Sequence, residues 1–252
     1  MDALATARAT AAPLNDLGSA FYFSPQAAAR AEAIGLDVFL LYAGGRGGIL
    51  GDRTSAEVDE EFFFFKPGMI TLMVEAARAS ADPAAIAEAH LGAADDYAQA
   101  TFGGIDPAAM AGFDAAAHVV VDTLPSGSWP LVDGYRAAAL PADPVASAYR
   151  QAVILRELRG GVHLDAVVAA GLTAAVACQF DRGDDYYALH GFSDEDRVPE
   201  IPELLATRAA AEEATDVAMA ELFADLDTGQ RSDLAAGAGA LFAAMTEPVP
   251  VN

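Results

Sequence analysis

The sequence predicts an all-α fold with two related helical halves. Alanine is the commonest residue of the chain, and it has the highest helix propensity. Prolines stand where helices would begin and glycines stand where they would end. In addition, residues 161–183 repeat the order of helix, Gly-Leu, apolar helix and Arg-Gly that is found in residues 25–47.

The composition limits the classes of function. With 252 residues, of which 54% are hydrophobic, the chain can bury a sizeable core. Its formal net charge of −23 repels phosphate backbones, so we expect no nucleic-acid partner. Because we find no clean membrane-spanning run and no signal peptide, we expect a soluble, cytoplasmic protein without a membrane partner.

The first helices are predicted from their boundaries. Residues 25–33 are expected to form a helix with Pro25 in its first turn and Gly35 as its stop. A buried helix is expected over residues 37–43. The next segment, residues 44–51, contains five glycines and is expected to be a flexible or sharply turned loop.

The glycine-rich segment raises the question of nucleotide binding. A dinucleotide-binding loop requires Gly-x-Gly-x-x-Gly after a strand, but Leu50 occupies the third glycine position. A Walker loop requires a lysine near its end, and no lysine lies near this segment. We therefore interpret the segment as a turn and not as a phosphate-binding loop.

Further helices are expected before residue 121. One covers residues 55–65, carries its acidic residues first, and is ended by Pro67. Others are expected over residues 69–80, 83–91 and 93–102. The segment AAHVVV, residues 116–121, fits either a strand or the end of a helix.

The composition changes at residues 122–144, which contain four prolines, two glycines and the only tryptophan, Trp129. We interpret this segment as a linker or crossover. It would join an N-terminal helical half, residues 1–121, to a C-terminal helical half, residues 145–252.

In the second half, helices are expected over residues 145–159 and 162–170, with a break at the glycine pair between them. When residues 161–183 are aligned with residues 25–47, Arg182 matches Arg46 and Gly171 matches Gly35. From this match we predict an internal duplication with these two arginines at equivalent turns.

The segment RELRGGVHLD contains the closest grouping of candidate functional side chains. Arg156 and Arg159 are three residues apart and share a helix face. Together with His163 they are suited to bind a carboxylate or phosphate, and His163 is a candidate catalytic acid or base. The alternative is an ion-pair cluster with Glu157 and Asp165 that holds two helices together.

The four consecutive phenylalanines, residues 62–65, cannot all face one core, because a helix turns by about 100° per residue. Some of these rings are candidates for the wall of a pocket between the halves, where clefts are favoured. The candidate ligand-binding residues are Tyr42, Arg46, Phe62, Phe65, Arg156, Arg159 and His163. We expect Arg159→Ala and His163→Ala each to abolish ligand binding and to leave the fold intact.

No metal site and no cofactor are predicted. The chain has no His-Glu-x-x-His motif, no pair of cysteines and no EF-hand loop. The acidic residues between positions 181 and 196 are interpreted as a solvated surface or as helix caps.

Three segments resemble one known family. They are YAGGRGGILGDRTSAEVDEEFFFFKPGMI, AYRQAVILRELRGGVHLDAVVAAGL and HGFSDED. They are similar to the signatures of an actinobacterial family of mostly uncharacterised all-α proteins that is labelled as helix-turn-helix. The resemblance implies degenerate winged-helix-like elements. Leu158, Gly161 and Phe192 depart from it, since the family often has His, Asp and Trp there.

Three functions remain open from the sequence. The first is a binding protein for a small anionic or carbonyl-bearing molecule, with its pocket between the two halves. The second is a helix-turn-helix transcriptional regulator. The third is a cofactor-independent enzyme that uses His163 as acid or base. The sequence also leaves a homodimer open.

Overall fold

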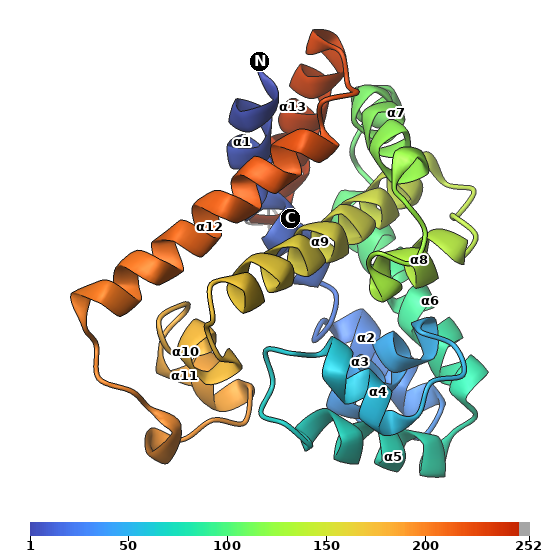
Figure 1. Cartoon of the computed structure of the whole chain (residues 1–252). Helices are drawn as coiled ribbons and strands as arrows, with labels where there is room; N and C mark the ends of the chain where they lie inside the picture. The colour runs from blue at the N-terminus through green and yellow to red at the C-terminus, as the bar shows by residue number, and fades with distance from the viewer. Residues whose placement is uncertain (247–252) are drawn as a thin grey trace.

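The computed structural model describes residues 1–246, and this part of the chain is all-α, as predicted (Figure 1). It contains thirteen α-helices and one 3₁₀ helix. They are α1 (Ala3–Ser19), α2 (Pro25–Ala33), α3 (Val38–Ile49), α4 (Ser55–Glu61), α5 (Met69–Ser80), α6 (Pro83–Phe102), α7 (Pro107–Thr123), α8 (Pro130–Ala137), α9 (Pro144–Ala169), α10 (Ala174–Gln179), α11 (Asp184–Leu189), η1 (Asp194–Asp196), α12 (Pro202–Leu222) and α13 (Thr228–Thr246).

Capping residues explain where most helices begin. Eight helices, α1 to α4, α6, α7, α9 and α10, follow an Asp, Ser or Thr whose side chain accepts hydrogen bonds from the first turn. Several of these eight helices, including α2, α6 and α9, also start with a proline. The predicted bounds of α2 and α5 are confirmed.

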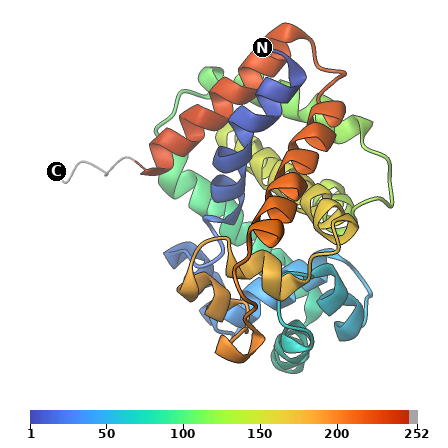
Figure 2. The ribbon, with the colours of Figure 1, turned by 60° about the vertical axis from the view of Figure 1, so that its left-hand side comes forward.

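Helix α9 lies at the centre of the molecule. It packs against α1, α6, α7, α8 and α12, and α13 packs against α1 and α7 (Figures 1 and 2). A second group, α2 to α5, lies at one end of this bundle, and α6 contacts both groups. Helices α10 and α11 pack on each other beside the second group. The cleft described below lies where these groups meet.

The central bundle combines both predicted halves of the sequence, because α1 and α7 precede residue 121 and α9, α12 and α13 follow residue 145. One hydrophobic cluster runs from Ala7 to Leu241. The predicted linker, residues 122–144, contains α8, whose Val132 and Tyr135 are buried in that cluster. This segment is therefore part of the core.

Residues 44–49 of the glycine-rich segment are helical, so the loop predicted over residues 44–51 is wrong except for the turn at its last two residues. A Cβ atom on Gly44 would lie 2.7 Å from the Cβ of Ala77 in α5, and one on Gly45 would lie 2.4 Å from the Cβ of His90 in α6. The glycines thus allow α3 to approach both helices closely. This packing offsets the cost of glycine in a helix, about 1 kcal/mol per residue relative to alanine.

The predicted break at Gly160 and Gly161 is also absent, because α9 runs through both residues. A Cβ atom on Gly161 would lie 2.4 Å from Cδ1 of Trp129, so this glycine makes room for the indole ring. A Cβ atom on Gly160 would meet no atom within 4 Å. Gly160 instead faces open space, which belongs to the cleft.

Two other boundaries differ from the prediction, and one open alternative is decided. The segments 83–91 and 93–102 form one helix, α6, and residues 116–121 form the last part of α7, as the helical alternative predicts. The helix predicted over residues 55–65 ends at Glu61, and the phenylalanines follow it in a turn.

The internal duplication is not confirmed beyond one shared turn. Gly35 and Gly171 both adopt positive φ, at 75° and 71°, and the next residue donates back to the preceding helix at 2.9 and 3.1 Å. The helices that follow, α3 and α10, have 12 and 6 residues. Arg46 and Arg182 are therefore not at equivalent turns, since Arg46 lies inside α3 and Arg182 follows α10.

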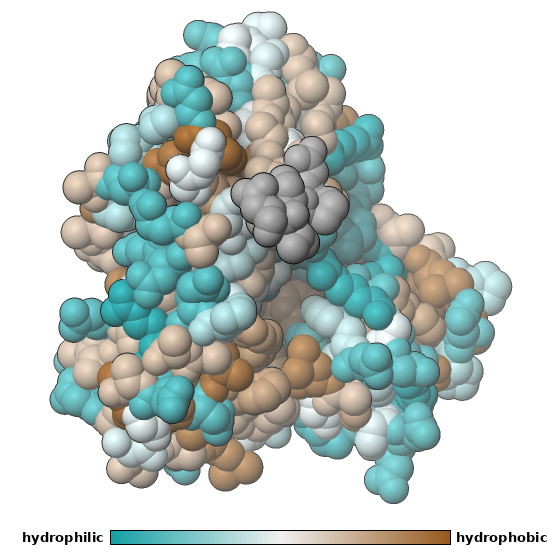
Figure 3. All heavy atoms as spheres, turned by 180° about the vertical axis from the view of Figure 1, so that it is seen from behind, coloured by the Kyte–Doolittle hydropathy of each residue, from teal (hydrophilic) through white to brown (hydrophobic). Residues whose placement is uncertain are grey.

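Residues 1–246 contain no strand, so no β-wing accompanies the helices there. Within the same range, no helix is both long and apolar enough to cross a membrane. Seen from behind, the surface mixes hydrophilic and weakly hydrophobic areas, with scattered strongly hydrophobic residues between them (Figure 3).

Candidate ligand-binding site

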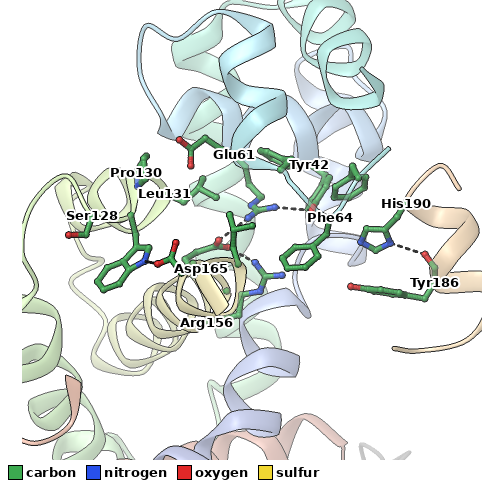
Figure 4. Close-up of a pocket in the computed structure, with 18 residues that line it drawn as sticks. Tyr42, Glu61, Phe64, Ser128, Pro130, Leu131, Arg156, Asp165, Tyr186 and His190 are labelled. Carbon is green, nitrogen blue, oxygen red and sulfur yellow. Dashed lines mark hydrogen bonds and ion pairs between the residues drawn. The ribbon is translucent and has the colours of Figure 1, made fainter. Parts of the chain in front are cut away.

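A cleft opens between α3 and α4 on one side and α8, α9 and α11 on the other (Figure 4). Its cavity measures about 310 Å³ and is lined by residues of these helices and of the turn that follows α4. Lys66 of this turn holds α11 in place, since its backbone N–H donates to the carbonyl of His190 at 2.8 Å and its Nζ pairs with Asp196 at 2.8 Å.

The inner wall of the cleft is an ion network between α3 and α9. Nη2 of Arg46 donates to Oε2 of Glu157 at 2.8 Å, and Nη1 of Arg156 donates to Oε1 at 2.9 Å. The hydroxyl of Tyr22 donates to the same Oε1 at 2.7 Å, and Tyr42 accepts from Nη1 of Arg46 at 2.9 Å. Glu157 is thereby the shared acceptor of two cations.

This network carries a net positive charge in the interior. Arg46 is 6% exposed and Glu157 is 3% exposed. Burial by itself would raise the pKa of Glu157, but Arg46, Arg156 and the Tyr22 hydroxyl outweigh it and lower that pKa to about 2. One carboxylate thus faces two guanidiniums. The Nε atoms of Arg46 and Arg156 are buried without a hydrogen-bond partner among the described residues.

Aromatic rings surround the guanidinium of Arg46. Its Cζ lies 4.4 Å from the ring centre of Phe62 and 5.4 Å from that of Tyr42. The ring of Phe65 packs 6.1 Å from that of Tyr42. Because cations are attracted to aromatic faces, these rings stabilise a buried guanidinium that one carboxylate only partly neutralises.

His90 lies behind the network and is neutral. Its Nε2 lies 2.6 Å from the hydroxyl of Tyr135. Burial and the nearby charge of Arg46 lower the pKa of His90 to about 3. A protonated His90 would add a further positive charge to a site that already has an excess.

Arg159 and His163 line a second cavity of about 320 Å³, which adjoins the first because Arg156 and Gly160 line both. Arg159 pairs with Glu212 of α12 at 3.2 Å, and Nδ1 of His163 lies 3.0 Å from Oγ1 of Thr215. Burial lowers the pKa of His163. The ion-pair alternative holds for both arginines, with Arg156 paired to Glu157 as predicted. Arg159 pairs with Glu212, and Asp165 accepts from Trp129 instead.

At the other end of the cleft stand Tyr186 and His190 (Figure 4). Nδ1 of His190 lies 2.7 Å from the backbone oxygen of Tyr186. The ring of His190 packs between those of Phe65 and Tyr186, at 4.4 and 4.1 Å. The open end carries two carboxylates that already have partners, since Asp165 accepts from Trp129 and Glu61 accepts from Arg53.

Five of the seven predicted ligand-binding residues meet at the first cavity. They are Tyr42, Arg46, Phe62, Phe65 and Arg156. Arg159 and His163 line the second cavity instead, whereas Arg156 and Gly160 line both cavities. The structure thus brings two segments together that resemble separate family signatures.

Several residues of the site were not predicted from the sequence. They are Tyr22, Trp129, Tyr186 and His190. Trp129 stood out only as the single tryptophan of the predicted linker, and His190 only as the first residue of the segment HGFSDED. The role of Glu157 depends on Arg46, which is 111 positions away. No spacing rule links residues at that separation.

The described residues contain no group of three His, Cys, Asp or Glu side chains placed to hold a metal ion. All 14 cationic side chains of the chain lie in this range and are engaged. Twelve pair with carboxylates. The other two, Arg78 and Arg231, donate to backbone carbonyls.

The fold defines an all-α protein in which several successive helices are joined by short turns that contain a glycine with positive φ. The chain belongs to a helix-turn-helix family, whose model matches residues 7–197. This range contains α2 to α11, and so includes every residue that lines the first cavity. Neither the curated proteins nor the solved structures provide a match to the chain.

Proposed function

We propose that the protein binds a small anionic molecule in the cleft beside Arg46 and Arg156. The observation that carries this proposal is the excess of charge in the network, in which two arginines share Glu157 alone. Buried charges in proteins are normally paired, because removing an ion from water costs several kcal/mol. A bound anion would supply the missing negative charge.

The surplus positive charge beside Glu157 supports an anion over a neutral carbonyl compound. Both Nε–H groups are buried without a protein partner, and a buried donor without a partner costs about 1–3 kcal/mol. A carboxylate accepts two parallel hydrogen bonds from one guanidinium. Of the two, Arg156 is the more accessible, since its side chain is 21% exposed and that of Arg46 is 7% exposed.

The space around Arg156 is sufficient for a metabolite. Arg156 and Tyr186 line the first cavity, the second cavity and a third of about 280 Å³. Ligand pockets typically begin at about 300 Å³. The first and second cavities therefore have the volume for a molecule the size of a substituted aromatic acid beside Arg156.

The helix-turn-helix membership keeps DNA binding as the alternative, but the charges favour the small molecule. Specific DNA binding uses clustered lysines and arginines that are available to phosphates and bases. Here every cationic side chain is already engaged within the chain, and the net charge is −23. A helix-turn-helix unit in such a chain serves as a scaffold for the cleft.

The third function, catalysis by His163, has weaker support. His163 stacks on Phe64 with a ring separation of 5.7 Å, and its Nδ1 lies by Thr215 of α12. These contacts fix α9 to α12 and leave the imidazole at the edge of the second cavity. We therefore propose a structural role for His163.

Native mass spectrometry of the purified protein tests the proposal. We expect a co-purified small acid on the wild-type protein and its loss from Gly160→Leu, because a side chain at Gly160 projects into the cleft without a clash. Gly239→Ala in α13, which also meets no atom within 4 Å, is the control and should retain the ligand. Retention of the same ligand by Gly160→Leu would contradict the proposal.

A further inference from the structure

His190 offers the cleft a hydrogen-bond acceptor that the protein does not use. The residue is 6% exposed and lines both the first and the third cavity. Its Nδ1 lies 2.7 Å from the backbone oxygen of Tyr186. A carbonyl oxygen can only accept, so the proton of the neutral ring lies on Nδ1 and Nε2 carries the lone pair.

Within residues 1–246, the His190 ring makes a hydrogen bond through Nδ1 and none through Nε2. Figure 4 shows the ring with one nitrogen directed to Tyr186 and the opposite side facing the cleft. The rings of Phe65 and Tyr186 hold it in this orientation. Burial lowers the pKa of His190, which keeps the acceptor unprotonated.

The polar groups of the cleft differ in kind along its length. Arg46 and Arg156 can only donate, whereas Nε2 of His190 can only accept in this tautomer. Glu61 and Asp165 also accept, but they lie at the other end and already have partners in Arg53 and Trp129. A ligand that satisfies the inner cleft therefore needs an anionic group and, apart from it, a donor.

The walls determine the shape of this ligand. They are largely aromatic, with Tyr42, Phe62, Phe64, Phe65, Trp129 and Tyr186 among the lining residues. Aromatic walls favour a flat ring, since stacked and edge-to-face contacts add to the burial of apolar area. A planar guanidinium likewise matches a planar carboxylate.

We propose that the cleft binds a hydroxylated aromatic carboxylate, with its carboxylate on Arg156 and its hydroxyl donating to Nε2 of His190. The inference rests on the proposed anion site and adds a specificity-determining residue to it. Benzoate would satisfy only the arginine, whereas a hydroxybenzoate of the right geometry satisfies both groups.

Isothermal titration of the full-length protein with benzoate and with 2-, 3- and 4-hydroxybenzoate tests this inference. We expect at least one hydroxybenzoate to bind about tenfold more tightly than benzoate, as one added hydrogen bond allows. In His190→Asn the amide can still donate to the carbonyl of Tyr186, but the Nε2 acceptor is gone. The preference for the hydroxyl should then fall to about twofold or less.

His118→Asn is the matched control, because His118 lies on α7, bonds to Gln151 and the backbone of Asp114, and does not line the cleft. It should keep the full preference. A long-range ¹H–¹⁵N spectrum of the imidazoles provides a readout without ligand, and it should show His190 protonated on Nδ1 and unprotonated on Nε2.

The outcomes separate the two proposals. Suppose that benzoate binds and that Arg156→Gln weakens its binding. If the wild-type protein then shows no preference for the hydroxyl, or if the preference persists in His190→Asn, only the assignment to His190 is overturned. If none of the probes binds the wild-type protein, or if Arg156→Gln leaves their binding unchanged, the anion site is contradicted and the inference falls with it. A His190 ring protonated on Nε2 alone would also overturn the inference.

Discussion

Arg46 and Glu157 are 111 positions apart in the chain, yet their side chains meet in the interior at 2.8 Å. The pair joins α3 to α9 and so connects the second helical group to the central bundle. Arg156 approaches the same carboxylate from the cleft at 2.9 Å. The cleft, its charge and the contact between the two helical groups therefore depend on one glutamate.

Glu157→Gln should destabilise the fold strongly. The glutamine keeps the shape of the side chain but leaves the buried guanidinium of Arg46 and the partly buried one of Arg156 without a countercharge. Removal of one partner of a buried pair typically costs about 3–5 kcal/mol. Urea unfolding at pH 7 measures the change.

The control is Glu212→Gln. The side chain of Glu212 is 40% exposed, and it pairs with Arg159. This substitution should cost about 1 kcal/mol or less. Equal losses of unfolding free energy in the two variants would show that Glu157 is not a buried centre of charge.

Stability should fall below pH 6.5 because of His90. The pKa of His90 is lowered to about 3 in the folded protein, so the unfolded chain binds the proton first as the pH drops from its ordinary value near 6.5. The stabilisation is complete above pH 6.5 and is lost as the pH falls towards 3.

His90→Gln removes this titration and retains a group that can bond to Tyr135. Between pH 7 and pH 5 the wild-type protein should lose about 2 kcal/mol more unfolding free energy than the variant. This window lies above the range in which the pKa of Glu157, lowered to about 2, affects stability. Parallel pH profiles for the two proteins would contradict a neutral, buried His90.

Gly45→Ala should destabilise the protein although alanine is the better helix former. The added Cβ would lie 2.4 Å from the Cβ of His90, and overpacking of a core costs about 1–3 kcal/mol. In Gly239→Ala, where no atom lies within 4 Å, the same change should stabilise by up to about 1 kcal/mol. Thermal unfolding of both variants measures the difference, and a stabilised Gly45→Ala would mean that α3 and α6 are not in close contact.

The sequence was sufficient to predict the all-α class, because alanine content, caps and prolines all act locally. It was misleading where tertiary contacts outweigh local preferences. The glycines of α3 and the pair at Gly160 and Gly161 were interpreted as breaks, but the first allow close helix packing and Gly161 accommodates Trp129. Such reasons lie in the partner helix and not in the segment itself.

The candidate site was predicted only in part, because residue types can be read from the sequence but tertiary contacts cannot. Residue type identified Arg46 and Arg156 as anion-binding candidates and the phenylalanines as a wall, and the structure brings them to one cavity. Arg159 shares the sequence context of Arg156 but faces Glu212 of α12. His190 depends on the turn that places its Nδ1 by Tyr186, which a pattern of residue types does not contain.

The measurement that tests the central claim most directly is the titration of wild-type protein and Arg156→Gln with the benzoate series. Arg156→Gln removes the surplus charge and leaves Arg46 and Glu157 as a neutral pair, so the variant should fold. Arg8→Gln, which breaks a surface pair with Glu213, is the control. We predict a loss of at least about tenfold in affinity, or about 1.4 kcal/mol, in Arg156→Gln and none in Arg8→Gln; equal affinities in all three proteins would contradict a cleft built around a buried excess of positive charge.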